Sequence, residues 1–268
     1  MNFSNKGLIQ ATIFSNCLCN SPYYDLNKLQ TDRLNNLVEN SRKLSPFYKK
    51  KFSYLPDRNV RLEEIPVSTK TELMEHFNSW ITNRSLKLSE IKKYLSNISN
   101  IGKPIFDKYL LMESSGSSGT PGIFLHDLKA VEIYHALEAS RRANSSLINQ
   151  FLGHLYFREK LVYIGALNRH YAGIASILYS KKCYPPLKSI IKEVSIYSSK
   201  SKLAQTLNNF NPTVMATYPS TAISLAEDQM QGILKFHPRE IWLGGETLGL
   251  NQKNYIQSVF SAKVFNSY

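Results

Sequence analysis

Short β-rich runs alternate with helical stretches through the second half of the chain, and this alternation narrows the possible folds more than any other feature. The expected strands are 161–164, 194–197, 214–218, 240–243 and 263–265. The expected helices are 128–142, 173–179, 202–210, 220–231 and 251–260. Strands separated by helices of about ten to fifteen residues predict βαβ units and a largely parallel sheet. In such a sheet the ligand lies beyond the carboxyl ends of the strands.

The first hundred residues show helical patterning instead. Apolar residues from Leu26 fall on one helical face as far as Ser45-Pro46, where the residue before proline leaves the helical region. Thr69 and Glu72 have the spacing of a capping box. A further helix is expected over 88–95. The predicted organisation is an α/β fold with residues 1–105 as an N-terminal helical segment. Residues 106–268 are expected to form the α/β portion of the same large domain.

Composition places the chain among globular proteins. It has 268 residues, of which 43% are hydrophobic, enough for one large domain or two small ones. The longest apolar stretch, Leu8 to Cys19, is interrupted by polar residues and is shorter than the roughly 20 residues of a membrane helix. Cys17, Cys19 and Cys183 make an odd count, which is typical of a reducing compartment. We therefore expect a soluble, cytoplasmic protein with no membrane partner, no disulfide framework and no zinc site.

The charge of the chain favours anionic partners. Thirty-three Lys and Arg residues against 20 Asp and Glu give a net charge of +13. Such a field suits nucleic acid, acidic lipid headgroups or a nucleotide triphosphate. The basic residues are spread along the chain, however, and Lys49-Lys50-Lys51 is the densest run. Nucleic acid is therefore a possible partner but not the favoured one.

A run of glycine and hydroxyl residues is the clearest candidate for a binding site. Residues 113–122 read Glu-Ser-Ser-Gly-Ser-Ser-Gly-Thr-Pro-Gly. Gly116 and Gly119 can adopt positive φ and let backbone N–H groups converge on an anion. The alternative is a flexible linker. The run is not a Walker loop, because no Gly-Lys-Ser/Thr follows it. Closely flanking apolar sequence on both sides favours a phosphate-binding loop.

This run resembles the phosphate-binding signature of the adenylate-forming superfamily, [ST]-S-G-[ST]-T-G-x-P. Other segments resemble the family in order and spacing. They are Ser45-Pro46-Phe47-Tyr48, Ile65-Pro66-Val67-Ser68-Thr69-Lys70, Asn211-Pro212, Tyr218-Pro219-Ser220, Leu225-Ala226, Gly244-Gly245-Glu246 and Lys263 to Tyr268. The opening segments resemble the branch of phenylacetate–CoA ligase-like, capsule-biosynthesis and coenzyme F390 synthetase-like proteins. The resemblance runs from about residue 30 to the last residue.

The sequence departs from the family pattern at three places. Ser118 stands where threonine is usual, and Gly122 stands where many members carry lysine. The chain also stops at Tyr268, before the family's metal-supporting glutamate and the C-terminal domain with its catalytic lysine. We therefore expect an incomplete large N-terminal domain that does not catalyse pyrophosphate exchange at a family-like rate.

The resemblance implies ATP-dependent activation of a carboxylic acid to an acyl-adenylate, followed in many members by transfer to CoA or a carrier-protein thiol. It implies ATP or AMP, Mg²⁺ with an incomplete site, and CoA as cofactors, and a small carboxylic acid as substrate. The implied phosphate ligands are Ser114, Ser115, Gly116, Ser117, Ser118, Gly119 and Thr120. The implied adenine site is Gly244, Gly245, Glu246 and Tyr268. Tyr171, Gly173 and Tyr218 would line the acid site, and His170 would be the catalytic donor to the carboxylate.

Alternatives remain beside these assignments. Gly244-Gly245 also fits a plain strand-to-helix turn, and His170 also fits a surface or capping histidine. The chain as a whole fits a split or catalytically inactive homologue that acts as a binding module. No histidine, cysteine or acidic spacing indicates a metal ligand set.

Overall fold

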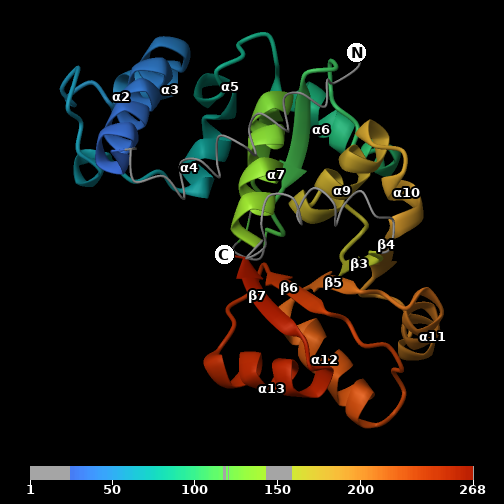
Figure 1. Ribbon diagram of the computed structural model, residues 1–268. Coiled ribbons are helices and arrows are strands. Elements are labelled where there is room, and N and C mark those ends of the chain that lie inside the picture. The colour runs from blue at the N-terminus through green and yellow to red at the C-terminus, as the bar shows by residue number, and fades with distance from the viewer. Residues whose placement is uncertain (1–24, 117–118, 120, 143–158, 268) are drawn as a thin grey trace. The chain divides into compact units, whose positions relative to one another are not determined.

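The chain forms two compact units in the computed structural model, which describes residues 25–116, 119, 121–142 and 159–267 (Figure 1). The first unit comprises Met1–Asn100 and Pro104–Leu137, and the second comprises Ile101–Lys103 and Glu138–Tyr268. None of the helices described in these ranges is both long and apolar enough to cross a bilayer.

The first unit consists of helices and one small antiparallel sheet. Its helices are α2 (Leu26–Leu44), α3 (Pro46–Lys51), α4 (Lys70–Glu75), α5 (Phe77–Trp80), α6 (Leu88–Leu95) and the start of α7 (Leu128–Arg142). Single 3-10 turns lie at Leu62–Glu64 and Ile98–Asn100. Strands β1 (Tyr109–Glu113) and β2 (Ile123–Asp127) pair antiparallel. A core that includes Phe77, Ile91 and Leu111 joins α5 and α6 to this hairpin.

Local sequence sets where these helices begin and end. Ser45 caps α3 by accepting a hydrogen bond from the Tyr48 N–H (3.3 Å), and Pro46 occupies the first helical position, where its missing N–H costs nothing. Thr69 and Glu72 form the predicted capping box at the start of α4. The predicted ends of α2 and both ends of α6 are confirmed.

The second unit is built on a parallel sheet of five strands in the order β4-β3-β5-β6-β7. The strands are β3 (Leu161–Gly165), β4 (Ile191–Ser195), β5 (Val214–Thr217), β6 (Glu240–Gly244) and β7 (Lys263–Ser267). The connecting helices are α9 (Ala172–Cys183), α10 (Leu187–Ile190), α11 (Lys200–Phe210), α12 (Pro219–Met230) and α13 (Leu250–Phe260). The predicted α/β class with a mostly parallel sheet is therefore confirmed.

The helices of this unit cover opposite faces of the sheet (Figure 1). Helices α11, α12 and α13 pack on one face, over a core that includes Val162, Met215 and Ile241. Helix α9 packs on the other face, where Ile174 and Ala175 lie against Tyr163. Because side chains alternate along a strand, Val162 and Tyr163 of β3 serve the two different cores.

Two predicted element boundaries in the second unit, those of β4 and α12, were wrong. The strand expected at 194–197 begins three residues earlier and ends two residues earlier, at Ile191–Ser195. Within it, Glu193 is paired with Lys181 of α9 (2.7 Å). The helix expected over 220–231 begins one residue earlier, at Pro219, with Tyr218 in the cap position. The Ser220 side chain donates a hydrogen bond to Glu246 (2.9 Å).

Candidate functional site

The glycine-serine run is the closed loop of the β1–β2 hairpin. The strands pair as far as Glu113 and Ile123. Beyond them the Ser114 N–H donates to the Gly122 carbonyl (2.9 Å), and the Gly122 N–H donates to the Ser114 hydroxyl (2.8 Å). Two hydrogen bonds therefore fasten the base of the loop. The linker interpretation is wrong, because a hairpin within one small sheet joins no separate parts.

Two glycines of this loop have backbone conformations that other residues adopt only with strain. Gly116 has φ +74° and Gly119 has φ +111°, and the Gly119 N–H donates to the Gly116 carbonyl (2.9 Å). A Cβ on Gly116 would lie 2.9 Å from Cγ of Pro121. Turns of this kind expose backbone N–H groups to an anion. The predicted ligands Ser117, Ser118 and Thr120 lie outside the described residues.

Lys70 lies against the exit of the same loop. A Cβ on Gly122 would be 3.2 Å from Cδ of Lys70 and 2.8 Å from the Phe124 ring. One helical turn further along α4, the sulfur of Met74 accepts a hydrogen bond from the Ile123 N–H (3.4 Å). The face of α4 that carries these two side chains therefore packs on residues 122–123. Glycine at 122 leaves room for the side chain of Lys70.

The strand ends of the second unit form the other candidate region. From β3 the chain crosses by α9 to β4 on one side, whereas from β5 it crosses by α12 to β6 on the other. The connections that leave these adjacent strands thus run over opposite faces of the sheet. Such a topological switch point opens a crevice beyond the carboxyl ends of the two strands, where ligands bind in open α/β sheets. His170, Tyr171 and Gly173 follow β3, and Tyr218 follows β5.

A hydrogen bond between two tyrosines spans the switch point. The phenols of Tyr163 on β3 and Tyr218 after β5 are hydrogen-bonded to each other. Burial raises the pKa of Tyr163 well above its ordinary range, and the negative charge and the hydrogen bond of Tyr218 raise it further. The pair of phenols therefore bridges β3 and the segment that follows β5.

His170 is buried in the loop between β3 and α9. Its exposed fraction is 1%, so the surface interpretation is wrong. The cap position of α9 belongs to Tyr171, the next residue. A buried imidazole at the carboxyl end of β3 remains a candidate donor to a ligand in the crevice.

The turn after β6 is fastened to the start of α12. Glu246 accepts hydrogen bonds from the Ser220 N–H and from the Ser220 hydroxyl, both at 2.9 Å. Gly244 ends β6, and Gly245 adopts φ +80° with the Tyr218 ring close by, 3.1 Å from where its Cβ would be. Glycine is therefore required here by the protein's own packing, as expected of a strand-to-helix turn. Tyr268 lies outside the described residues.

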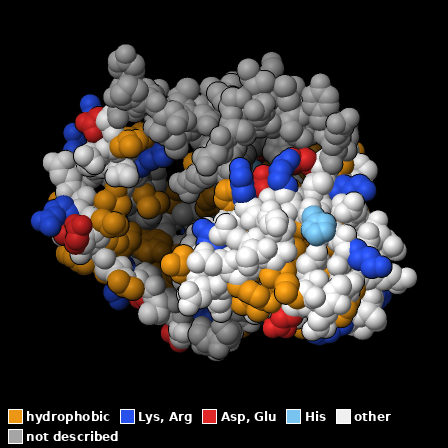
Figure 2. Space-filling view, turned by 60° about the horizontal axis from the view of Figure 1, so that its bottom comes forward, with side chains coloured by type: hydrophobic (Ala, Val, Ile, Leu, Met, Phe, Trp, Pro, Cys, Tyr) orange, Lys and Arg blue, Asp and Glu red, His pale blue; other side chains and the backbone are white. Residues whose placement is uncertain are grey.

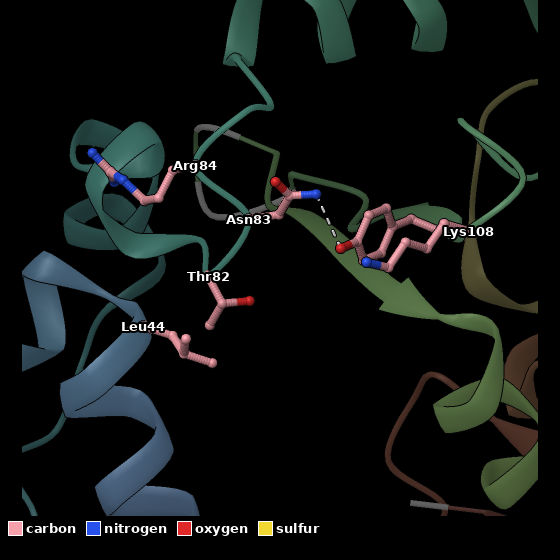
Figure 3. Close-up of a pocket in the computed structure, with 6 residues that line it drawn as sticks. Leu44, Thr82, Asn83, Arg84 and Lys108 are labelled. Atoms are coloured by element: carbon pink, nitrogen blue, oxygen red, sulfur yellow. Dashed lines mark hydrogen bonds between the residues drawn. The ribbon is translucent and has the colours of Figure 1, made fainter.

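The first unit also has a shallow pocket of about 330 Å³ that is separate from the glycine-serine loop. Its lining residues are Leu44, Thr82, Asn83, Arg84, Lys108 and Tyr109. The Asn83 amide points to Tyr109 and donates to its hydroxyl (3.1 Å), whereas the Arg84 side chain points away from both (Figure 3). The Arg84 guanidinium donates to the Asn78 carbonyl. We assign no function to this pocket.

The basic residues do not form a continuous surface on the face seen in Figure 2, where Lys and Arg side chains lie singly or in small groups among acidic and neutral ones. Several are paired with carboxylates, among them Arg42 with Asp57, Lys51 with Glu72, and Arg239 with Glu159. Within the described ranges, no three His, Cys, Asp or Glu residues come together as a metal site.

Solved structures with a similar fold are those of a CoA ligase. A 2-hydroxyisobutyryl-CoA ligase in an open conformation, in complex with 2-HIB-AMP and CoA, matches with a TM-score of 0.62 and 18% identity, over 92% of this chain and 54% of that chain. The same ligase in the postadenylation state, with 2-HIB-AMP, matches with a TM-score of 0.62 and 20% identity, over 92% and 49%. The sequence matches no protein-family model and no curated protein.

The chain thus has the fold of these CoA ligases, which confirms the fold expected from its motifs. It spans about half the length of these two ligases.

Two residues of the candidate site were missed by the sequence analysis. Lys70 lies 52 positions from Gly122, and only the packing of α4 on the hairpin brings them together. A signal existed, since Lys70 belongs to a segment that resembles the family and Gly122 lacks the usual lysine. Tyr163 looked like an ordinary strand residue. The glycines at 165 and 173 were the available signal in the sequence, because residues without a side chain leave space for a large neighbouring side chain such as that of Tyr163.

Proposed function

We propose that this chain is the ATP- and acid-binding part of an adenylate-forming ligase, within the phenylacetate–CoA ligase-like branch that its opening segments resemble. The observation that carries the proposal is the closed glycine-serine hairpin loop with its two left-handed glycines. The fold of the chain and the crevice at the switch point support it.

In the proposed reaction, a carboxylate oxygen attacks the α-phosphorus of ATP. The bond from that phosphorus to the oxygen bridging to the β-phosphate breaks, and pyrophosphate leaves with the electron pair. The loop residues 114–120 hold the β- and γ-phosphates by their N–H groups and hydroxyls, which stabilise charge that grows on the leaving group. Lys70 supplies the cation that Gly122 cannot.

The crevice of the second unit orients the other reactants. The backbone of Gly244 and Gly245 lies along the adenine, with Glu246 holding the turn in place through Ser220. His170 donates a hydrogen bond to the carboxylate. Such positioning converts an encounter of separate molecules into reaction within one complex. Mg²⁺ would neutralise charge on the phosphates, and we assign it no ligand among the described residues.

The acceptor of the acyl group in this proposal is a thiol, either CoA or a carrier protein. The protein would act in the cytoplasm, where ATP and CoA are available and Cys183 stays a thiol. The role of an inactive binding module remains the second candidate, and it shares the nucleotide site.

Calorimetry with ATP tests the phosphate loop. We expect the double variant Gly116→Ala, Gly119→Ala to weaken binding by about tenfold to a hundredfold, because an alanine at positive φ distorts the N–H groups that hold the phosphates. Gly232→Ala is the matched control, since Gly232 also has positive φ (+73°) but lies in open space away from the loop. Equal ATP affinity in the double variant and in the control would exclude the loop as the phosphate site.

A further inference from the structure

The phenol of Tyr163 lies close to the backbone of two glycines, Gly165 and Gly173. A Cβ on Gly165 or on Gly173 would lie 2.5 Å from the Tyr163 hydroxyl oxygen. No side chain can replace either hydrogen without moving the ring, because real Cβ atoms do not approach other atoms so closely. From the sequence, Gly173 is expected to line the acid site. The space beside it is filled by Tyr163 of the same chain.

Neighbouring side chains leave the ring little freedom. Tyr163 packs with Ile174 and Ala175 of α9, which are buried, and its hydroxyl is hydrogen-bonded to Tyr218. The Tyr218 ring in turn lies against Gly245. The two phenols therefore connect the ends of β3 and β5, which flank the crevice, with the turn after β6.

We propose that Tyr163 and Tyr218 close the inner end of the acid-binding crevice and restrict its substrates to short carboxylic acids. This inference rests on the proposed function, which puts the carboxylate beside His170 at the carboxyl end of β3. A longer acyl chain that continued from there between the sheet and α9 would need the volume of the Tyr163 ring. The ring already occupies that volume, between Gly165 and Gly173 and against Ile174 and Ala175.

Acyl sulfamoyl adenosines test the restriction, because these stable analogues of an acyl-adenylate bind without any reaction. The series carries acetyl, butanoyl, octanoyl and phenylacetyl groups, and adenosine sulfamate without an acyl group is the parent compound. We expect the unchanged chain to bind the acetyl and butanoyl compounds at least about tenfold more tightly than the octanoyl and phenylacetyl compounds.

Variants of Tyr163 separate steric closure from a merely structural role. Tyr163→Ala empties a volume of about one phenol and is expected to improve the octanoyl-to-acetyl affinity ratio by at least about tenfold. Tyr163→Phe keeps the ring and loses the hydrogen bond to Tyr218, so its preference stays with the short acids. Tyr197→Ala, at an exposed tyrosine, is the matched control and changes nothing.

Each outcome decides the inference. Equal affinity of the unchanged chain for the short and long compounds overturns it, whether or not the variants fold. An unaltered ratio in folded Tyr163→Ala overturns it as well. If the parent compound binds but the acyl series shows no preference, the proposed function stands and only the restriction fails. If no compound binds, the parent included, the proposed function fails together with the inference.

Discussion

Some side chains of this chain contact residues that are distant in sequence, so the sequence around them does not predict these contacts. Lys70 belongs to a helix, yet its stem lies over a glycine of a distant hairpin. Gly122 has no side chain to carry a charge, and under the proposed function Lys70 would supply the loop cation from a different part of the chain. Only the packing of α4 on the hairpin places the stem of Lys70 beside Gly122, and the sequence alone does not show this.

Removal of the Lys70 charge should weaken ATP binding. We expect about a tenfold loss for Lys70→Met, because a hydrogen bond to a charged group contributes about 1.5 to 3 kcal/mol and this side chain is half-buried. Lys70→Arg should keep most of the affinity, and adenosine, which has no phosphate, should bind equally to all forms. Calorimetry checks this, with Lys50→Met at an exposed lysine as control. An equal loss of adenosine affinity would show that Lys70 acts on the fold and not on the phosphates.

At the scale of elements, the sequence predicted what depends on local chemistry. Helices α6 and α7 begin and end where apolar spacing placed them, and the capping box of α4 forms as expected. Errors arose where an element depends on distant partners. Strand β4 contains the charged residues Lys192 and Glu193, which interrupt the apolar pattern that would have indicated where the strand begins. Glu193 fits in the strand because Lys181 of α9 forms an ion pair with it. The candidate site is equally non-local: the motifs were found, but the Tyr163–Tyr218 pair and Lys70 were not.

The start of α12 illustrates such a distant partner and gives a stability test. Glu246 accepts from both donors of Ser220 and so acts as the cap that this helix lacks in its own sequence. Glu246→Ala should lower the free energy of unfolding by about 1 kcal/mol, the usual cost of a lost cap. Chemical denaturation measures the change. Glu227→Ala, at an exposed position of the same helix, should have little effect. A similar loss in both variants would contradict the capping role.

The start of α4 is expected to respond to acid. The hydrogen bond from Lys51 lowers the pKa of Glu72 below 4.5, with further help from the Lys51 charge and from the Thr69 N–H. Because the folded pKa lies below the unfolded one, this stabilisation is complete above about pH 4.5 and is lost as the pH falls through the lowered pKa. Glu72→Gln should therefore destabilise the chain at pH 7 more than at about pH 3. Denaturation at the two pH values checks this, with the exposed Glu75→Gln as control. A pH-independent difference would be inconsistent with the ion pair.

For the whole molecule, the net charge of +13 leaves two interpretations that differ in their response to salt. A nucleic-acid surface needs many cations side by side, because release of counterions from many phosphates drives such binding. Here, several cations of the described residues are paired with nearby carboxylates, among them Arg42, Lys51, Lys181 and Arg239. Figure 2 shows no continuous basic face on the side viewed. A nucleotide site needs only a few N–H groups and a single well-placed cation, such as Lys70 beside the hairpin loop.

We therefore expect the chain to bind ATP but not duplex DNA at moderate salt. ATP affinity should fall only a few-fold between about 50 and 200 mM salt, since the nucleotide has few charges, whereas a protein with six to ten phosphate contacts on DNA loses about a thousandfold or more over that range. Calorimetry with ATP and filter binding with DNA measure the two responses, and excess DNA should not displace ATP. Tight DNA binding with a steep salt dependence, or displacement of ATP by DNA, would contradict this expectation. Either result would mean that the basic residues form a surface for polyanions and that the positive charge of the chain does not act mainly at the hairpin loop.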